Sequence, residues 1–300
     1  MALRRVLGAR VGSVAASLTF PEIPGFTRAI SVPTRHGASP TTAYDPPSGT
    51  AAPAVHVNFH GGGYVFGHPE QDDPLCRYLA AAAKVVVVNV DYLLAPEHPF
   101  PHAVEECFDI VRWVAVHGRE QGWDGSRLSV GGQSAGGGLA AAVARQARDS
   151  ADPRIAIQVL HYPPLDLVTD AATKPSRTKR PMISPWLAEL FNTAYIPDPA
   201  HRSDPLASPA YGNNGDNLEG IAPALVITPE LDRLHDEGAH YANRLQASGA
   251  LVGQIDVPGA DHAYNRLGGD IGTVKEIYDA IASAIAKAHG NGTGRDSARR

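Results

Sequence analysis

The sequence predicts an α/β fold, in which a mostly parallel central sheet carries helices on both faces. From about residue 54 onward, apolar segments of strand length alternate with segments of helical length, which is the pattern of repeated βαβ units. The segment KVVVVNVDY at 84–92 is rich in β-branched residues, as is typical of a strand buried on both faces. The 300 residues, of which 43% are apolar, are enough for one large domain with a full core.

The individual elements follow from the same patterns in chain order. Residues 1–20 are predicted to form a short amphipathic cap helix, because their apolar residues recur at helical spacing. An antiparallel edge hairpin is expected at 28–33 and 41–45. Apolar segments predict further strands at 54–59, 84–92, 127–132, 154–160, 223–228 and 251–257. Segments of helical length, one of them rich in alanine, predict helices near 72–83, 102–117, 135–148, 236–248 and 272–288.

The alternation of strands and helices is interrupted once. Residues 164–217 are rich in Pro, Asp, Ser and Asn, with a helical patch at 184–195. An insertion of this length in a compact domain is typical of a lid or binding element, and we expect it to form a cap or lid. The polar tail at 290–300 is expected to be disordered.

Composition and charge narrow the possible partners. The net charge of −5 argues against nucleic acid or an anionic membrane as the main partner, since both select basic surfaces. No segment approaches the roughly 18 apolar residues of a membrane-spanning helix, and Arg10 interrupts the apolar run that a signal peptide needs. We therefore expect a cytoplasmic protein without stable membrane association. The sequence leaves the oligomeric state open, a homodimer included.

Neither a metal nor a cofactor is expected. The two cysteines, Cys76 and Cys107, are too few for a disulfide framework and are expected to be buried. The sequence contains no CxxC and no HExxH motif, so a metal site is not indicated. Its glycine-rich segments match neither a P-loop nor a dinucleotide-binding fingerprint.

The motif Gly132-Gln133-Ser134-Ala135-Gly136 predicts a nucleophile at Ser134. The motif is weak by itself in a chain with 30 glycines. Its context is more specific, because it follows a predicted strand and opens a predicted helix, as a nucleophile elbow requires. Such a sharp turn needs glycine on both flanks. The alternative is a glycine-rich turn without chemistry.

A second glycine motif, His60-Gly61-Gly62-Gly63, directly follows the predicted strand at 54–59. Acyl transfer builds an oxyanion, and backbone N–H groups must point at it. Glycines leave that approach free of side chains, although a flexible turn is the alternative. Because both glycine motifs follow strands of one parallel sheet, they support each other as parts of one acyl-transfer site.

A serine nucleophile also needs a histidine base and a carboxylate that orients the histidine. His262 is the downstream histidine that lies in a loop between the last predicted strand and the last predicted helix. Asp232, shortly after the strand at 223–228, is the predicted acid. Its rival Asp236 is interpreted as a helix N-cap, and Asp261 is expected to point away from its neighbour His262.

Taken in order, the motifs resemble those of the hormone-sensitive-lipase-like branch of the α/β-hydrolase fold esterases. The resemblance runs from about Pro21 to about His289. Its motifs are HGGGY (60–64), DYLLAPEHPFP (91–101), GGQSAGG (131–137), YPPLDL (162–167), DPLASP (204–209), PELDRLHDEG (229–238) and DHAYNR (261–266). It implies an α/β-hydrolase domain at 21–289 with a small helical cap.

The resemblance also implies roles for particular residues. The catalytic triad would be Ser134, Asp232 and His262. The oxyanion hole would be formed by the N–H groups of Gly62, Gly63 and Ala135.

The sequence departs from this family at four positions. Gln133 stands where the family usually has Asp or Thr, and Leu93 replaces an arginine. Arg233 replaces a proline, and Ala263 replaces the glycine that usually follows the histidine. These departures affect the subfamily and the substrate but remove no member of the triad.

The resulting expectation is hydrolysis of small carboxylic esters with short- to medium-chain acyl groups through a covalent acyl-enzyme. An amidase or thioesterase with the same triad is the alternative within enzymes, and a non-catalytic ligand-binding receptor is the alternative outside them. The acyl chain is expected to lie against Tyr64, Phe66, Trp186 and Phe191, for which ordinary core or lid packing is the other interpretation. The polar insertion favours soluble esters over lipid interfaces.

Overall fold

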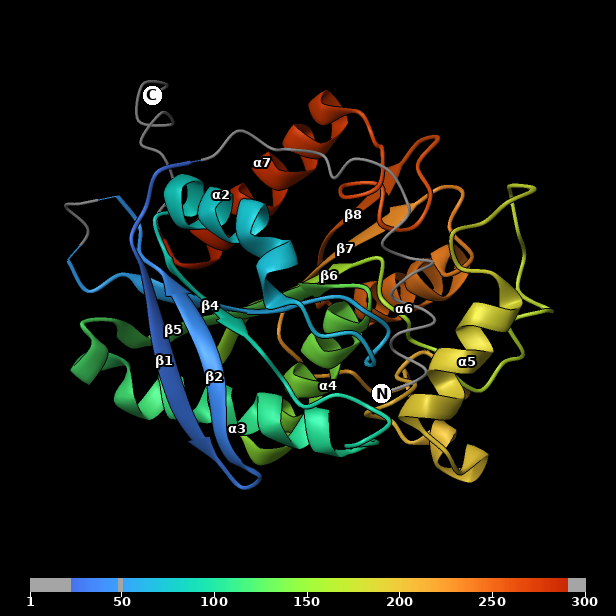
Figure 1. Cartoon of the computed structure of the whole chain (residues 1–300), viewed down its shortest axis with the longest axis horizontal. Helices are drawn as coiled ribbons and strands as arrows, with labels where there is room; N and C mark the ends of the chain where they lie inside the picture. Colours follow the sequence, from blue (N-terminus) through green and yellow to red (C-terminus); the bar gives the residue numbers. More distant parts are fainter. Residues whose placement is uncertain (1–22, 48–50, 291–300) are drawn as a thin grey trace.

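In residues 23–47 and 51–290, which this computed structural model describes, eight strands form one sheet in the order β1-β2-β4-β3-β5-β6-β7-β8 (Figure 1). The strands are β1 (Thr27–Thr34), β2 (Gly37–Tyr44), β3 (Ala54–Phe59), β4 (Val86–Val90), β5 (Asp124–Gln133), β6 (Ile155–His161), β7 (Ala224–Pro229) and β8 (Leu251–Val257). β2 pairs antiparallel with β1 and β4, and the other neighbouring strands pair parallel. The predicted mostly parallel sheet is confirmed.

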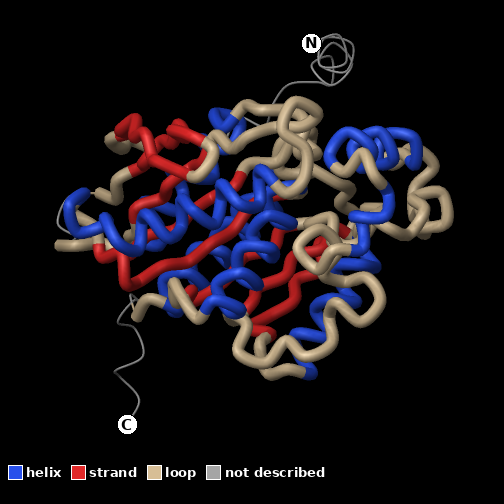
Figure 2. The backbone as a smooth tube through the Cα atoms, turned by 90° about the horizontal axis from the view of Figure 1, so that it is seen from below, coloured by secondary structure: helices blue, strands red, loops and turns tan. Residues whose placement is uncertain are grey.

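Helices cover both faces of this sheet (Figure 2). The helices are η1 (Pro69–Asp72), α2 (Asp73–Ala83), α3 (His102–His117), η2 (Gly118–Gln121), α4 (Ala135–Ser150), α5 (Pro185–Tyr195), η3 (Pro199–Ser203), α6 (His235–Ala247) and α7 (Ile271–Ala288). Buried side chains of α2 and α7 belong to one hydrophobic cluster, and those of α3, α4 and α6 belong to the other. Each cluster lies on one face of the sheet.

The β-branched run around β4 shows how the sheet supplies both clusters. Val86, Val88 and Val90 are fully buried in the cluster under α3 and α4, whereas Val85 and Val87 are fully buried in the cluster under α2 and α7. Side chains of a strand alternate between its faces, so a strand buried on both faces must be apolar at every position. This explains the unbroken valine run.

Four strands differ in length from the prediction: β1 and β2 extend to the hairpin turn that joins them, at Thr34 and Gly37, and β4 and β5 differ at their starts. β4 begins at Val86 because Lys84 ends α2 in a left-handed conformation with φ 56°. β5 begins at Asp124, three residues earlier than expected, because Asp124 pairs with Ala54 ahead of a register shift in the ladder. Apolar periodicity identified the strand cores but carries no information about these polar ends.

The insertion between β6 and β7 packs at the end of the sheet near α6, where α5 appears in yellow (Figure 1). Ser184 caps α5, since its hydroxyl oxygen accepts a hydrogen bond from Leu187 N at 3.2 Å. At the other end of α5, the Tyr195 ring stacks on Tyr64 with centroids 3.8 Å apart. The insertion is therefore fastened to the loop that follows β3.

Several sequence predictions concern the chain ends and the cysteines. The cap helix predicted at 1–20 lies outside the described residues, as does the predicted tail beyond residue 290. Within the described part, no helix is both long and apolar enough to cross a membrane. Cys76 and Cys107 are buried free thiols, as expected.

Replacing Leu160 by alanine tests how strongly the sheet core holds the fold. Leu160 on β6 is fully buried, so the cavity left by Leu160→Ala should lower the free energy of unfolding by about 2–5 kcal/mol. Urea denaturation followed by circular dichroism measures this loss. The control Val252→Ala removes a side chain that is 52% exposed and should change the free energy by less than about 0.5 kcal/mol. Equal effects of the two changes would contradict the packing argument.

Candidate active site

Ser134 lies on a sharp turn between β5 and α4. Its backbone has φ 53° and ψ −123°, a sparsely populated conformation that costs about 1–3 kcal/mol for a residue with a side chain. The N–H of Ser134 donates to the carbonyl oxygen of His161, at the end of β6, at 2.9 Å. The sheet itself therefore holds the turn.

Close approach to β3 explains the two glycines that flank Ser134. A Cβ atom on Gly136 would overlap the carbonyl oxygen of Phe59 at the end of β3, and so would a Cβ atom on Gly132. A Cβ on Gly61 would lie 3.6 Å from the Cβ of Ser134. The turn and the loop after β3 are thus in direct contact, as the two glycine motifs predicted.

The loop after β3 adopts a conformation that favours glycine. Gly62 has φ 131° and Gly63 has φ 61°, and the carbonyl oxygen of Gly62 accepts hydrogen bonds from Val65 N at 3.1 Å and Phe66 N at 2.9 Å. A Cβ on Gly63 would lie 2.6 Å from the ring of Phe191 on α5. The insertion therefore covers this loop directly.

Three backbone N–H groups near Ser134 have no acceptor among the described residues. They belong to Gly62, Gly63 and Ala135. Ala135 is the first residue of α4, where the helix end carries partial positive charge. Free N–H groups at such a position suit a bound oxyanion.

Ser134, His262 and Asp232 form one hydrogen-bonded chain. His262 Nε2 lies 2.8 Å from Ser134 Oγ, and His262 Nδ1 lies 2.7 Å from Asp232 Oδ2. The other carboxylate oxygen of Asp232 accepts from Leu234 N at 3.0 Å, and the Asp232 side chain has no exposed surface. Tyr162 packs edge-on against the His262 ring, with centroids 4.8 Å apart.

The rival acids face other groups. Asp236 was expected to be a helix N-cap, but this was wrong, because it is the second residue of α6 and Leu234 occupies the cap position. Its carboxylate pairs with Arg177 at 2.7 Å. Asp261 accepts from the backbone N–H groups of His262 and Met182, so it faces the insertion instead of the imidazole ring.

The loop of His262 departs from the family at a strained position. Ala263 has φ 59°, in the left-handed region, which costs about 1–2 kcal/mol for a residue with a Cβ. The glycine that usually stands here would avoid this conformational cost.

A narrow pocket that opens to solvent begins at Ser134. Its lining comprises Gly63, Tyr64, Ser134, Pro164, Asp166, Leu167, Ala171, Lys174, Ile183, Ala188, Phe191, Asn192, Arg233, Leu234 and Glu237. Of the four aromatic residues predicted to contact substrate, Tyr64 and Phe191 line this pocket. Phe66 packs edge-on against Phe191 at 5.8 Å, and Trp186 is 61% exposed on α5; neither lines the pocket.

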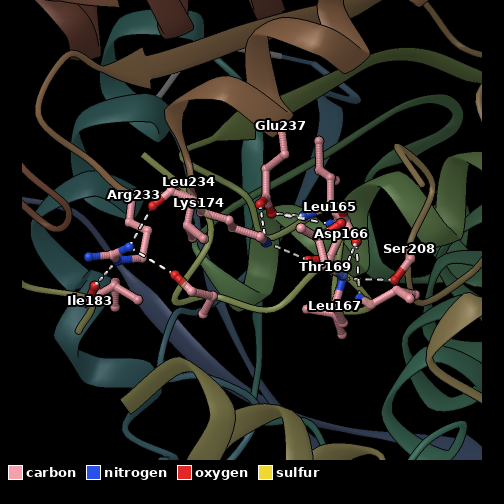
Figure 3. A network of polar contacts seen from close by, with 12 residues as sticks. Leu165, Asp166, Leu167, Thr169, Lys174, Ile183, Ser208, Arg233, Leu234 and Glu237 are labelled. Carbon is pink, nitrogen blue, oxygen red and sulfur yellow. Dashed lines mark hydrogen bonds and ion pairs between the residues drawn. The ribbon is translucent and has the colours of Figure 1, made fainter. Parts of the chain in front are cut away.

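Sequence reasoning missed the charged side of this pocket (Figure 3). Glu237 forms a buried ion pair with Lys174, and the backbone N–H of Leu165 donates to Glu237 Oε1 at 2.7 Å. Burial raises the pKa of Glu237, and the Lys174 ammonium partly offsets this effect. Glu237 belongs to the motif PELDRLHDEG, so its position was visible in the sequence. Lys174 lies in the irregular insertion, where no pattern indicates a partner.

Gln133, another departure from the family, connects the turn of Ser134 to the loop of His262. Gln133 Oε1 lies 2.7 Å from the hydroxyl of Tyr162 and accepts a hydrogen bond from Asn265 Nδ2. Asn265 follows His262 by three residues, and Tyr162 packs on the His262 ring. The Tyr162 hydroxyl also lies 2.6 Å from Asn265 Oδ1, so Gln133, Tyr162 and Asn265 form one buried hydrogen-bonded group next to the base.

A buried carboxylate lies behind the loop after β3. Asp72 Oδ2 accepts from Asn58 Nδ2 at 3.1 Å, whereas Oδ1 is buried without a hydrogen-bond partner among the described residues. Burial raises the pKa of Asp72 to about 6, which the Asn58 amide and the Arg266 charge oppose. In the part of the chain that the structure describes, no three His, Cys, Asp or Glu side chains gather to hold a metal ion.

Comparisons with known proteins agree with this geometry. A family model described as alpha/beta hydrolase fold matches residues 56–266. Ethyl acetate hydrolase from Pseudomonas putida is 37% identical over 266 residues, which cover 85% of this chain and 81% of that protein. Esterase LipI from Mycobacterium tuberculosis is 35% identical over 246 residues, which cover 81% of this chain and 76% of that protein.

Solved structures of esterases are also similar to this chain. An esterase from Pyrobaculum calidifontis superposes with a TM-score of 0.84 at 33% identity, covering 95% of this chain and 92% of that one. A thermophilic carboxylesterase from a metagenomic library superposes with a TM-score of 0.82 at 33% identity, covering 96% of each chain.

Gln133→Leu tests the connection between the two loops. The change keeps the approximate volume but removes the two hydrogen bonds to Gln133 Oε1, so that the Tyr162 hydroxyl keeps Asn265 Oδ1 at 2.6 Å and the Asn265 amide keeps the Tyr278 hydroxyl at 3.1 Å. It should lower the free energy of unfolding by about 1–3 kcal/mol, as measured by urea denaturation. Gln254→Leu, on an exposed position of β8, is the control and should have little effect. A Gln133→Leu protein as stable as the wild type would refute the connection.

Asp72→Asn tests the buried carboxylate through the pH dependence of stability. The folded-state pKa of about 6 lies above the usual value of 3.8, so the native state binds the proton more tightly than the unfolded state. The stabilisation of the native state that results from this tighter proton binding is fully present below pH 3.8 and is lost as the pH rises through 6. The stability of Asp72→Asn relative to the wild type should therefore increase between pH 4 and pH 7, by up to about 3 kcal/mol.

Thermal or urea denaturation of both proteins across this pH range measures the difference. Asp216→Asn, which removes an aspartate whose side chain is 69% exposed, is the matched control and should show a flat difference. A flat difference for Asp72→Asn as well would show that the buried carboxylate does not titrate in this range.

Proposed function

The chain belongs to the alpha/beta hydrolase fold family, and from this premise we propose that it hydrolyses small carboxylic esters with short- to medium-chain acyl groups. The observation that most directly supports this proposal is the hydrogen-bonded chain from Ser134 Oγ through His262 to Asp232. The family match covers residues 56–266, and the similar proteins are named as esterases. The resemblance to the hormone-sensitive-lipase-like branch is confirmed by this family match.

The proposed reaction begins with acylation of the serine. Ser134 Oγ attacks the ester carbonyl carbon while His262 Nε2 takes the hydroxyl proton. Asp232 holds the imidazole in the required tautomer and stabilises the imidazolium that forms. His262 then gives the proton to the leaving alkoxide, and the alcohol departs.

The second half of the reaction restores the enzyme. Water enters, His262 takes its proton, and the hydroxide attacks the acyl-enzyme carbonyl. The ester bond to Ser134 breaks, Ser134 Oγ regains its proton from His262, and the carboxylic acid leaves. In both halves the oxyanion would accept hydrogen bonds from the N–H groups of Gly62, Gly63 and Ala135, each worth about 10²–10³ in rate.

The insertion at 164–217 would serve as the lid of this site. Phe191 of α5 covers Gly63 and lines the pocket beside Ser134, so substrate would bind between the insertion and the sheet. A cytoplasmic location and a homodimeric state stay predictions.

The proposal is tested with p-nitrophenyl esters that carry acyl groups of different length, from two to sixteen carbons. The wild type should hydrolyse at least the short members, and Ser134→Ala should lower kcat by at least about 10⁴-fold. An organophosphate should phosphorylate Ser134 Oγ with loss of its leaving group and of the hydroxyl proton, which adds the mass of the phosphoryl group to the wild type, and should leave Ser134→Ala unmodified. No turnover at any chain length would refute the esterase proposal.

Matched ester, thioester and anilide substrates separate the proposed function from its closest alternative. Faster turnover of the thioester or anilide at equal acyl group would favour a thioesterase or an amidase with the same triad. Failure of organophosphate labelling would favour a non-catalytic ligand-binding protein.

A further inference from the structure

The pocket beside Ser134 has an apolar side and an ionic side. The rings of Tyr64 and Phe191 line the first. The second is lined by the ion pair of Lys174 and Glu237 together with Asp166 and Arg233. Figure 3 shows the two side chains of the ion pair pointing toward one another, Lys174 from the insertion and Glu237 from α6. Both sides border the space beside Ser134 into which a bound ester would extend.

The ion pair is satisfied inside the protein. Glu237 Oε1 accepts from the backbone N–H groups of Leu165 at 2.7 Å and Asp166 at 3.2 Å, and the other carboxylate oxygen accepts from Lys174 Nζ. Lys174 Nζ also donates to the carbonyl oxygen of Asp166 at 2.6 Å. The two side chains are only 11% and 6% exposed, so little water reaches either charge.

Arg233, directly after the triad acid, holds the backbone around Lys174. Arg233 Nη1 donates to the carbonyl oxygens of Ala171 at 2.8 Å and Lys174 at 2.7 Å, and Nε donates to that of Ile183 at 3.0 Å. These bonds tie both ends of the segment 171–183 to the loop after β7. The lysine is therefore built into the wall and cannot swing away without breaking several buried hydrogen bonds.

We propose that Lys174 and Glu237 determine the acyl specificity of this site, by giving the pocket an ionic wall that admits short acyl groups and disfavours longer apolar ones. The inference rests on the proposed ester hydrolysis and specifies its substrate class. It makes both residues specificity determinants, with no part in the proton transfers.

The physical reason is the different effect of a methylene group on the two sides of the pocket. Each methylene buried against apolar surface favours binding about fourfold. A methylene placed against the ion pair excludes the remaining water from both charges and offers no hydrogen bond in return. The gain in binding free energy from each added methylene therefore ends where the acyl group reaches Lys174 and Glu237.

The test is a variant with a neutral wall, Lys174→Met/Glu237→Gln. Met has nearly the length of Lys, and the amide oxygen that Glu237→Gln introduces can still accept from Leu165 N and Asp166 N. Replacement of a buried ion pair by neutral groups of similar volume is often neutral for stability. The ratio of kcat/KM for the p-nitrophenyl octanoate to that for the butyrate should rise at least tenfold over the wild type.

A second ion pair supplies the matched control. Arg177 and Asp236 also join the insertion to α6, at 2.7 Å, but their side chains are 38% and 45% exposed and do not line the pocket. Arg177→Met/Asp236→Asn removes the same kind of contact between the same two elements. Its octanoate-to-butyrate ratio should equal that of the wild type.

Three outcomes would overturn the proposal. The first is a folded neutral-wall variant that hydrolyses butyrate with an unchanged ratio. The second is an equal rise in the control variant, which would assign the effect to a loosened insertion. The third is a wild type that hydrolyses esters of ten to sixteen carbons as fast as butyrate.

The remaining outcomes are also informative. If the double variant does not fold, Lys174→Gln/Glu237→Gln removes both charges and keeps an amide that can form hydrogen bonds at each position. It should raise the ratio in the same direction, and an unchanged ratio would again overturn the proposal. A wild type inactive on every ester refutes the proposed function itself and is distinguishable from a failed specificity proposal, in which butyrate is still hydrolysed.

Discussion

The close approach of the turn at Ser134 to the end of β3 is the constraint on which the rest of the site depends. A Cβ on Gly136 would overlap the Phe59 carbonyl oxygen, so the chain can make this contact only with glycine. The contact forces the strained backbone of Ser134 and brings Gly61 against it. The nucleophile and the free N–H groups of the following loop are therefore positioned by one packing contact.

The parallel sheet supplies the remaining members of the site. Ser134, Asp232 and His262 follow β5, β7 and β8, and parallel strands present their carboxyl ends at one edge of the sheet. Residues separated by 128 positions in the chain can therefore form a hydrogen bond of 2.8 Å. The insertion also contacts this edge, since the N–H of Met182 donates to Asp261 beside His262, and its residues line the pocket.

Two buried polar groups join the parts that the sheet does not hold. Gln133 connects the turn of Ser134 to the loop of His262, and Glu237 connects α6 to the insertion through Lys174 and two backbone N–H groups. Each of these side chains forms its hydrogen bonds with protein groups instead of water. A buried network in which all hydrogen bonds are formed holds one geometry, because any displacement leaves a buried polar group unpaired. Glu237 and Lys174 in addition line the pocket beside Ser134 together with Asp166 and Arg233, which is the basis for the specificity proposed for the ion pair.

The sequence by itself determined the sheet, the order of its elements and the candidates Ser134, Asp232 and His262, because strand periodicity and short motifs are local patterns along the chain. It did not determine the strand ends at Val86 and Asp124, the first-turn position of Asp236, or the pairing of Lys174 with Glu237. Those depend on groups that meet only after the insertion folds back onto the sheet. A lysine in an irregular segment has no local signal for a carboxylate 63 residues away, so only the tertiary structure could decide what lines the pocket.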